Sequence, residues 1–243
     1  MSNTIYPELP DTAMTLAAGY GKRLRPLTLT RPKPLVRVGG KTLIDRTLNQ
    51  LVEAGITRTV VNLHYRGDML RTHLASRDAP EIVFSEEQTL LDTGGGVLHA
   101  LGDLGDRPFL VTNSDMIWTN GATNTLARMG RAFDPDTMDV LLLMQATVSA
   151  IGYRGTGDFT MRPDGRLQRR VKGRVVPFLF TGIQILHPRV FQGMLIEPFS
   201  LNRVYDRAEE AGRLFGIRHD GDWMDVGNRA GLERAENLLK GYR

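Results

Sequence analysis

Small and cationic residues gather between positions 16 and 35, and together they suit the binding of a phosphate group. Two glycines among the small residues of Ala17–Gly21 let backbone N–H groups approach an anion without obstruction from side chains. The cationic side chains that follow within twelve residues are Lys22, Arg23, Arg25, Arg31 and Lys33. The apolar residues 12–17 predict a strand, and the loop after such a strand is where α/β proteins usually bind ligands.

Two well-known phosphate-binding motifs do not fit this loop. A dinucleotide fingerprint needs a glycine three places after Gly21, where Leu24 stands. A P-loop needs a glycine five places before Gly40, where Leu35 stands. A tight solvated turn with scattered charge is the simplest alternative, but it does not explain why the string of small, proline and basic residues continues to position 34.

Two aspartates beside apolar segments are candidate metal ligands. Asp115 comes directly after the buried strand predicted at residues 108–113, and Asp225 lies between hydrophobic residues in DWMDVG, residues 222–227. A buried carboxylate is costly unless it is paired or metal-bound, and Mg²⁺ is a hard cation that prefers oxygen ligands. A polar turn that merely ends a strand is the alternative for Asp115, and Asp222 is the alternative to Asp225.

A run of three glycines ends the segment SEEQTLLDTGGG, residues 85–96. Consecutive glycines before a predicted helix permit close approach of the backbone, and a helix N-terminus favours anions. Packing alone is the alternative reason for a glycine-rich helix start.

Alternating strands and helices would position these residues at one edge of a sheet. Apolar runs and their periodicity predict strands at residues 12–17, 58–63, 81–85, 108–113, 140–147 and 178–186, and helices at residues 42–54, 66–76, 94–101, 122–132, 200–211 and 229–240. Residues 158–161 and 166–169, on either side of a Pro-Asp-Gly turn, predict a hairpin. We therefore predict an α/β fold with a central mixed, mainly parallel sheet covered by helices on both faces.

Composition restricts the class of protein. The chain has 243 residues, of which 41% are hydrophobic and 24% charged, as in folded globular proteins. The lack of cysteine excludes disulfides, thiolate metal sites and a cysteine nucleophile. No apolar run approaches the roughly 20 residues of a membrane span, and the N-terminus has no signal-peptide pattern, so we expect a cytoplasmic protein without a membrane partner. The five histidines show neither metal-ligand nor triad spacing, and we interpret them as structural.

The net charge of +4 indicates polyanionic partners without saying which. A nucleic-acid site would need aromatic residues among basic ones as a stacking platform, and the aromatic content is 7% with no such run. Small phosphorylated substrates account for the charge equally well, so we expect no nucleic-acid partner. The basic residues near the predicted hairpin suit a solvated face or subunit contact, with a substrate carboxylate as the alternative; they are Arg166, Arg169, Arg170, Lys172 and Arg174.

The string LAAGYGKRLRPLTLTRPKPL, residues 16–35, closely resembles the signature of the sugar-1-phosphate nucleotidyltransferases, LAAGxGxRxxPxT followed by PKP. The resemblance extends over nearly the whole chain, with the motifs in the family's order. It implies a Rossmann-like three-layer fold of glycosyltransferase-A type in a single domain, residues 1–243. Residues of about 12–115 would bind the nucleotide, and residues of about 116–243 the sugar. We expect no hexapeptide-repeat extension of the kind fused to some relatives.

The resemblance also implies roles for individual residues. Arg23 would contact the β- and γ-phosphates, and Lys33 the phosphates near the reacting centre. Nucleotide contacts would come from Leu16, Ala17, Ala18, Gly19, Gly21, Lys22, Glu87, Thr93, Gly94 and Asn113, and sugar contacts from Gly95, Asp158, Thr181 and Gly182. Asp115 and Asp225 would share Mg²⁺, with Ser114 where the family more often has glycine. Glu87, Gln88 or a backbone carbonyl would accept the N3–H of a uracil.

Within the family, EEQTLLDTGGG, NSD, GDF and FTGIQILHP look most like the N-acetylmuramate 1-phosphate uridylyltransferases of peptidoglycan recycling. This implies transfer of a nucleotidyl group from UTP to N-acetylmuramate 1-phosphate, with release of pyrophosphate. Mannose-1-phosphate guanylyltransferase is an alternative, because base choice turns on one or two hydrogen bonds worth about 1–3 kcal/mol each. A catalytically silent subunit that senses nucleotide-sugars is an alternative of another class, against which the presence of all four charged site residues speaks. We expect a monomer or small homo-oligomer.

Overall fold

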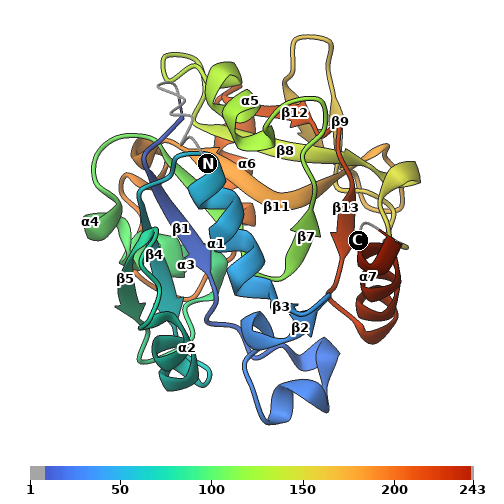
Figure 1. Ribbon diagram of the computed structural model, residues 1–243. Helices are drawn as coiled ribbons and strands as arrows, with labels where there is room; N and C mark the ends of the chain where they lie inside the picture. Colours follow the sequence, from blue (N-terminus) through green and yellow to red (C-terminus); the bar gives the residue numbers. More distant parts are fainter. Residues whose placement is uncertain (1–8, 242–243) are drawn as a thin grey trace.

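The computed structural model describes residues 9–241, which build one nine-stranded mixed sheet with helices on both faces (Figure 1). Four of its strands are parallel and lie in the order β6-β1-β4-β5: β1 (Thr12–Leu16), β4 (Arg58–Leu63), β5 (Glu81–Glu86) and β6 (Phe109–Asn113). The chain adds β4 and β5 on one side of β1 and then returns to place β6 on the other side. The strand order therefore reverses between β1 and β6, which is where open α/β sheets form a ligand-binding crevice.

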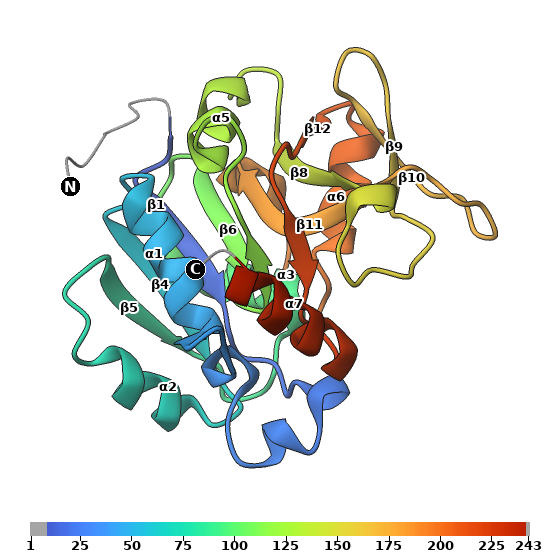
Figure 2. The ribbon, with the colours of Figure 1, turned by 45° about the vertical axis from the view of Figure 1, so that its right-hand side comes forward.

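A long strand, β11 (Phe178–Leu186), joins the parallel half to the rest of the sheet. It runs antiparallel to β6 and to β8 (Val140–Ala146), and its register with β8 shifts between Phe180 and Gln184. β12 (Leu214–Arg218) is parallel to β8, while β9 (Phe159–Met161) and β10 (Leu167–Arg169) form the predicted hairpin. Figure 2 shows β9 and β10 at the right-hand side of the molecule, and the turn of the hairpin contacts β12, because the N–H of Gly216 donates to the carbonyl of Gly165 at 2.9 Å. The sheet is thus mixed and mainly parallel, as expected.

The central strands supply two cores because successive side chains point to opposite faces of a sheet. Ala13 and Val61 pack with α1 (Leu43–Glu53), α2 (Gly67–Leu74) and α5 (Thr125–Ala132). Met14 and Val60 pack with α3 (Asp92–His99), α4 (Leu101–Leu104) and α6 (Asn202–Glu210). Burial of each large aliphatic side chain contributes about 1.5–3 kcal/mol. Because the central strands are apolar on both faces, helices pack on each side and the sheet becomes the middle layer.

A third, smaller core forms where the C-terminal helix α7 (Arg229–Gly241) meets β7 (Met116–Trp118), β13 (Trp223–Asp225) and the hairpin of β2 (Arg37–Val38) and β3 (Lys41–Thr42). Its buried members are Leu24, Val36, Val38, Leu43, Ile117, Met224, Val226, Leu232 and Ala235. Leu24 belongs to the predicted phosphate loop, and Met224 and Val226 flank Asp225. This core therefore holds the C-terminal end of the chain against the loop after β1.

Predicted elements form close to their expected bounds, with three corrections. Thr42 caps α1 instead of beginning it, because its hydroxyl accepts the N–H of Asp45 at 3.2 Å. The glycine run lies inside α3, not before it, and the predicted helix at residues 94–101 divides into α3 and α4. We did not predict β12 or the short strands β2, β3 and β7. β12 and β7 become strands only by pairing with distant partners, whereas β2 and β3 are two-residue strands that pair with each other.

Residues 1–8 and 242–243 lie outside the described part of the chain, so the predicted single domain of residues 1–243 stays a prediction. None of the described helices is both long enough and apolar enough to cross a membrane.

An ion-pair cluster at the start of β8 ties the C-terminal half together. Asp139 is buried, and its Oδ1 accepts hydrogen bonds from Arg189 Nε at 2.5 Å and from Arg213 Nε at 2.8 Å. Burial acts to raise the pKa of Asp139, but the hydrogen bonds and charge of the two guanidinium groups outweigh it and hold that pKa below its usual range.

Asp139→Asn is expected to lower the free energy of unfolding at neutral pH by about 1–3 kcal/mol, because two guanidinium groups lose their carboxylate. Since the folded-state pKa is depressed, the contribution is fully present above the unfolded-state pKa near 3.9. It is lost as the pH falls through the lower folded-state value. Denaturant titrations of both proteins at neutral pH and below about pH 4 will check this. A difference that does not shrink in acid would contradict an ionic origin.

Candidate active site

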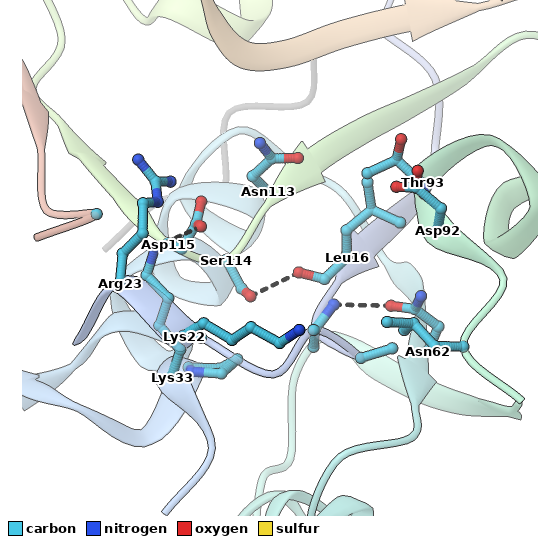
Figure 3. Close-up of a pocket in the computed structure, with 17 residues that line it drawn as sticks. Leu16, Lys22, Arg23, Lys33, Asn62, Asp92, Thr93, Asn113, Ser114 and Asp115 are labelled. Carbon is cyan, nitrogen blue, oxygen red and sulfur yellow. Dashed lines mark hydrogen bonds and ion pairs between the residues drawn. The ribbon is translucent and has the colours of Figure 1, made fainter. Parts of the chain in front are cut away.

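A cavity of about 350 Å³ opens at the C-terminal ends of β1 and β6, where the strand order reverses. The lining residues are Leu16, Ala17, Ala18, Gly19, Gly21, Lys22, Arg23, Lys33, Pro34, Asn62, Leu90, Asp92, Thr93, Asn113, Ser114, Asp115 and Gly227. Figure 3 shows Lys22, Arg23 and Lys33 on one side of this cavity and Asp92 and Thr93 on the other. The structure thus brings the predicted phosphate loop, Asn113 and Asp115 to one place.

Gly21 makes the turn on which the phosphate loop depends. Its φ is +61°, and a Cβ atom there would lie 2.9 Å from Thr28 Cγ2 and 3.0 Å from Lys33 Cβ. The hydroxyl of buried Thr28 donates to the carbonyl of Gly21 at 2.9 Å, and Tyr65 Oη donates to the carbonyl of Thr28 at 2.8 Å. The string of residues up to position 34 therefore folds back onto the glycine turn, which a simple solvated turn would not require.

Lys33 places a cation in the wall of the cavity. Its side chain is buried, and its Nζ donates to Asp115 Oδ2 at 2.6 Å, an ion pair that offsets the cost of burying an ammonium group. Arg25 and Arg31, the other two basic residues between Arg23 and Lys33, are exposed and do not line the cavity. Only three of the five predicted loop cations therefore converge.

Strand pairing makes Asp115 and Asp225 neighbours. β7 and β13 run antiparallel with Asp225 opposite Met116, the residue that follows Asp115. Asp225 Oδ1 accepts the N–H of Gly227 at 2.8 Å, and Gly227 lines the cavity although Asp225 does not. A Cβ atom at Gly227 would lie 2.7 Å from Asp225 Oδ1 and 3.0 Å from Arg23 Nη2. Glycine at this position therefore lets Arg23 and Asp225 approach the same point.

The two aspartates offer oxygen ligands that suit a magnesium ion. Asp115 uses Oδ2 to bind Lys33, Asp225 uses Oδ1 to bind Gly227, and no hydrogen bond within residues 9–241 engages the other carboxylate oxygen of either residue. Mg²⁺ is commonly held by one or two carboxylates together with substrate phosphates and water. No group of three or more His, Cys, Asp or Glu side chains able to hold a metal occurs among the described residues, so substrate oxygens would have to complete the coordination.

Asp222, the alternative second carboxylate, lies at the far end of this strand pair. Its backbone N–H donates to Thr119 Oγ1 at 3.0 Å, and its carbonyl accepts the N–H of Thr119 at 2.9 Å. Asp225 lies opposite Met116, the residue next to Asp115. Asp222 is three residues earlier in the chain, at the end of the strand pair that points away from Asp115. The geometry favours Asp225.

Glu87, which we predicted to contact the base, is buried and does not line the cavity, so this contact stays a prediction. Oε1 accepts from Asn62 Nδ2 at 2.7 Å, and Oε2 accepts from the N–H of Leu91 at 2.8 Å. The two bonds hold the carboxylate between β4 and the start of α3. Asn62 does line the cavity, but we did not predict it from the sequence. The sign that could have identified it is a single amide side chain near the end of the otherwise apolar strand RTVVNL.

The glycines of α3 serve packing. The N–H groups of Gly94 and Gly95 donate to the carbonyl of Phe199 at 2.8 and 3.1 Å, and neither residue lines the cavity. A Cβ atom at Gly95 would lie 2.2 Å from the carbonyl oxygen of Glu197. The chain's own residues 197–199 therefore pack closely against these glycines, and contacts of Gly94 and Gly95 with a substrate stay predictions. Thr93 does line the cavity, and its hydroxyl accepts the N–H of Leu201 at 3.0 Å.

The predicted sugar-side residues other than Gly95 lie on β11 and next to β9, outside the cavity lining. Asp158 is exposed, and its Oδ2 accepts the N–H of Phe180 at 2.9 Å. The buried hydroxyl of Thr181 donates to the carbonyl of Leu143 at 2.8 Å. Gly182, with φ at +88°, adjoins Asn113, since a Cβ atom there would lie 2.8 Å from Asn113 Nδ2. Contacts of these residues with a sugar stay predictions.

The remaining charged residues that we singled out lie outside the cavity. Arg166 pairs with Asp164 at 2.6 Å, Arg169 pairs with Asp206 at 3.0 Å, and Arg170 donates to the carbonyl of Gly157 at 2.9 Å. These internal partners agree with a solvated face for the basic hairpin.

No histidine of the described chain lines the cavity. Burial lowers the pKa of His187 and of His219, so both are neutral at neutral pH and neither is placed to transfer a proton to a substrate. This agrees with our interpretation of the histidines as structural.

Comparison with known proteins agrees with this geometry. Residues 12–158 match the family model described as nucleotidyl transferase. The chain is 41% identical to an N-acetylmuramate alpha-1-phosphate uridylyltransferase of Caulobacter vibrioides, over 96% of this chain and 98% of that protein. It is 35% identical to the protein of the same name from Neisseria meningitidis serogroup B, over 95% and 99% of the two chains.

Among solved structures, the inositol-1-phosphate CTP transferase from T. maritima shares the fold, with a TM-score of 0.74 and 20% identity over 95% of each chain. The family match covers every residue that lines the cavity except Gly227, and the two relatives match almost from end to end. The chain therefore belongs to the nucleotidyl transferase family.

Proposed function

We propose that this protein transfers a uridylyl group from UTP to N-acetylmuramate 1-phosphate and releases pyrophosphate, as a step in the recycling of cell-wall sugars. The observation that carries the proposal is the convergence at one cavity of the glycine turn, three cationic side chains and the Lys33–Asp115 pair. The choice of substrates is supported by the names of the two relatives that match almost the full chain.

In the proposed reaction, an oxygen of the sugar phosphate attacks the α-phosphorus of UTP, and the bond from that phosphorus to the leaving pyrophosphate breaks. A phosphate monoester is already an anion, so the reaction needs no strong general base and no covalent enzyme intermediate. We assign Lys22, Arg23 and the N–H groups of the glycine turn to the charge that builds on the pyrophosphate. Lys33, held by Asp115, would orient the phosphates at the reacting centre.

We propose Asp115 and Asp225 as the protein ligands of Mg²⁺. Their donor set fits a hard cation, since each carboxylate keeps one oxygen outside the hydrogen bonds described above. When bound, the ion would neutralise charge on the triphosphate. The contribution of the chain itself is to hold two carboxylates beside the phosphate loop, one directly before β7 and one in β13.

For the base we propose an acceptor other than Glu87, because Glu87 is buried and does not line the cavity. Gln88 is exposed, and Leu90 in the same segment lines the cavity. We propose that the N3–H of uracil donates either to Gln88 or to a backbone carbonyl of this segment.

A matrix of four NTPs against a panel of sugar 1-phosphates, scored by pyrophosphate release, tests the substrate choice. We expect UTP with N-acetylmuramate 1-phosphate to have the highest kcat/KM, by about tenfold or more over the next pair. A preference for GTP with mannose 1-phosphate would replace this proposal with guanylyl transfer. Nucleotide binding without pyrophosphate release from any pair would favour the catalytically silent subunit.

A further inference from the structure

We infer that Asn62 and Glu87 form a buried positioning pair, which couples the phosphate loop to the segment before α3 and thereby sets the affinity for the nucleotide. This inference rests on the proposed function, because it assigns the pair a part in binding the NTP. Neither residue would touch the reacting phosphorus; both act through the backbone that lines the cavity.

The chemistry of the contacts determines how the amide of Asn62 is oriented. The backbone N–H of Ala17 is a donor, so the atom that faces it at 2.7 Å must be the carbonyl oxygen of the Asn62 side chain. The amide nitrogen then faces Glu87 Oε1 at 2.7 Å and donates to it. Figure 3 shows the first of these bonds, from the start of the phosphate loop to Asn62. A reversed amide would place donor against donor on one side and acceptor against acceptor on the other.

Glu87 is anchored on both carboxylate oxygens and through its backbone. Oε2 accepts the N–H of Leu91 at 2.8 Å, while the backbone N–H of Glu87 donates to the carbonyl of Leu63 at 2.9 Å. The residue is 5% exposed, so water cannot readily replace a lost partner. A Cβ atom at Gly96 would lie 2.7 Å from Glu87 Oε1, which explains why the last glycine of the run is needed.

Three hydrogen bonds in series therefore join two walls of the cavity: Ala17 to Asn62, Asn62 to Glu87, and Glu87 to Leu91. Ala17 lies at the start of the phosphate loop, and Leu90, the neighbour of Leu91, lines the cavity. A substitution that replaces a donor of this series by an acceptor, or an acceptor by a donor, leaves two like groups facing each other. The backbone on one side of the cavity must then shift, because every member of the series is buried and must keep a partner. The distance between the phosphate-binding and base-binding segments then changes.

The pair allows a test in which each single substitution breaks the series and the double substitution repairs it. N62D places an aspartate oxygen against Glu87 Oε1, so that two carboxylates face each other. E87Q keeps one oxygen but turns its amide nitrogen toward a donor, either Asn62 Nδ2 or the N–H of Leu91. In N62D/E87Q, the introduced aspartate accepts from Ala17 and from the introduced glutamine, which in turn accepts from Leu91. The double variant thus restores all three bonds and the original net charge.

We expect each single variant to weaken equilibrium binding of UTP, measured by calorimetry without sugar phosphate, by about tenfold or more. The KM for UTP should rise in parallel while kcat changes less, and N62D/E87Q should return both values to within about threefold of wild type. The matched control is Thr59→Val, which removes a buried hydrogen bond of 3.0 Å to Thr15 between the same two strands, β1 and β4. It should lower the melting temperature without changing UTP affinity.

Two outcomes would overturn the inference while leaving the proposed function intact: single variants that bind UTP as wild type does, or a double variant no better than the singles. If the single variants are too unstable to assay, the double variant alone decides the test. The inference then requires that N62D/E87Q recover both the melting temperature and the UTP affinity of wild type. A wild-type protein that binds none of the four NTPs would instead overturn the proposed function, and the nucleotide role of the pair with it.

Discussion

Asp115→Ala is expected to slow pyrophosphate release by about 10³-fold or more, the size of effect that follows loss of a group organising charge at a phosphoryl-transfer centre. The substitution removes one proposed Mg²⁺ ligand and the partner of the buried Lys33 ammonium group, whose Nζ lies 2.6 Å from Asp115 Oδ2. The free Lys33 side chain would then turn away from the position that suits the phosphates. Steady-state release of pyrophosphate at saturating substrates, over a range of magnesium concentrations, measures the effect.

Two variants separate chemistry from folding in this experiment. Asp115→Asn keeps an oxygen that can accept from Lys33, so it should melt close to wild type and still lose most of the activity. Asp220→Ala is the matched control: Asp220 is an exposed aspartate that pairs with Arg128 and does not line the cavity. Its activity should stay within about threefold of wild type. Full turnover by Asp115→Asn at low magnesium would remove Asp115 from the proposed metal site.

Arg23→Glu should raise the KM for the NTP by about 10²-fold, because a charge-assisted contact with phosphate is lost and a like charge takes its place. Arg23 lines the cavity, and its guanidinium group lies beside Gly227. The carboxylate of Asp225 lies beside the same glycine. The introduced carboxylate would therefore face both the triphosphate and Asp225. Initial rates over a series of NTP concentrations, at low and high salt, give the KM and show how much of the loss is long-range electrostatics.

The control for this prediction is Arg25→Glu, two residues further along the same loop. Arg25 is exposed and does not line the cavity, so this variant changes the net charge equally without touching the site. We expect its KM to stay within about threefold of wild type. Equal losses in the two variants would mean that net charge, and not a specific contact of Arg23, governs NTP use.

Local sequence patterns sufficed for the fold class and for the core of the site. Apolar periodicity reports which backbone conformation buries a segment, so the parallel strands and most helices could be predicted within a few residues. Glycine and proline report special backbone geometry, and the turn at Gly21 bears this out. An aspartate directly after a buried strand must emerge at the end of that strand, which placed Asp115 at the sheet edge where the cavity lies.

Tertiary structure decided which of the candidates meet. Lys33 and Asp115 are 82 residues apart in sequence, and Asp225 reaches Asp115 only through the register of β7 and β13. Tertiary packing also points the Glu87 side chain inward, where it binds Asn62 and Leu91, and it places residues 197–199 against the glycines of α3.

The sequence by itself determined the glycine turn after β1, the order of the main strands and helices, and the aspartate that follows β6. These follow from the conformational preferences and burial of neighbouring residues, which are local properties. Only the tertiary structure decided which cations converge on the cavity. It also decided which carboxylates keep an oxygen without an internal hydrogen bond, and which accept internal hydrogen bonds on both oxygens. The physical reason is that every buried donor and acceptor must find a partner, and that partner is chosen by strand register and helix packing across the whole chain.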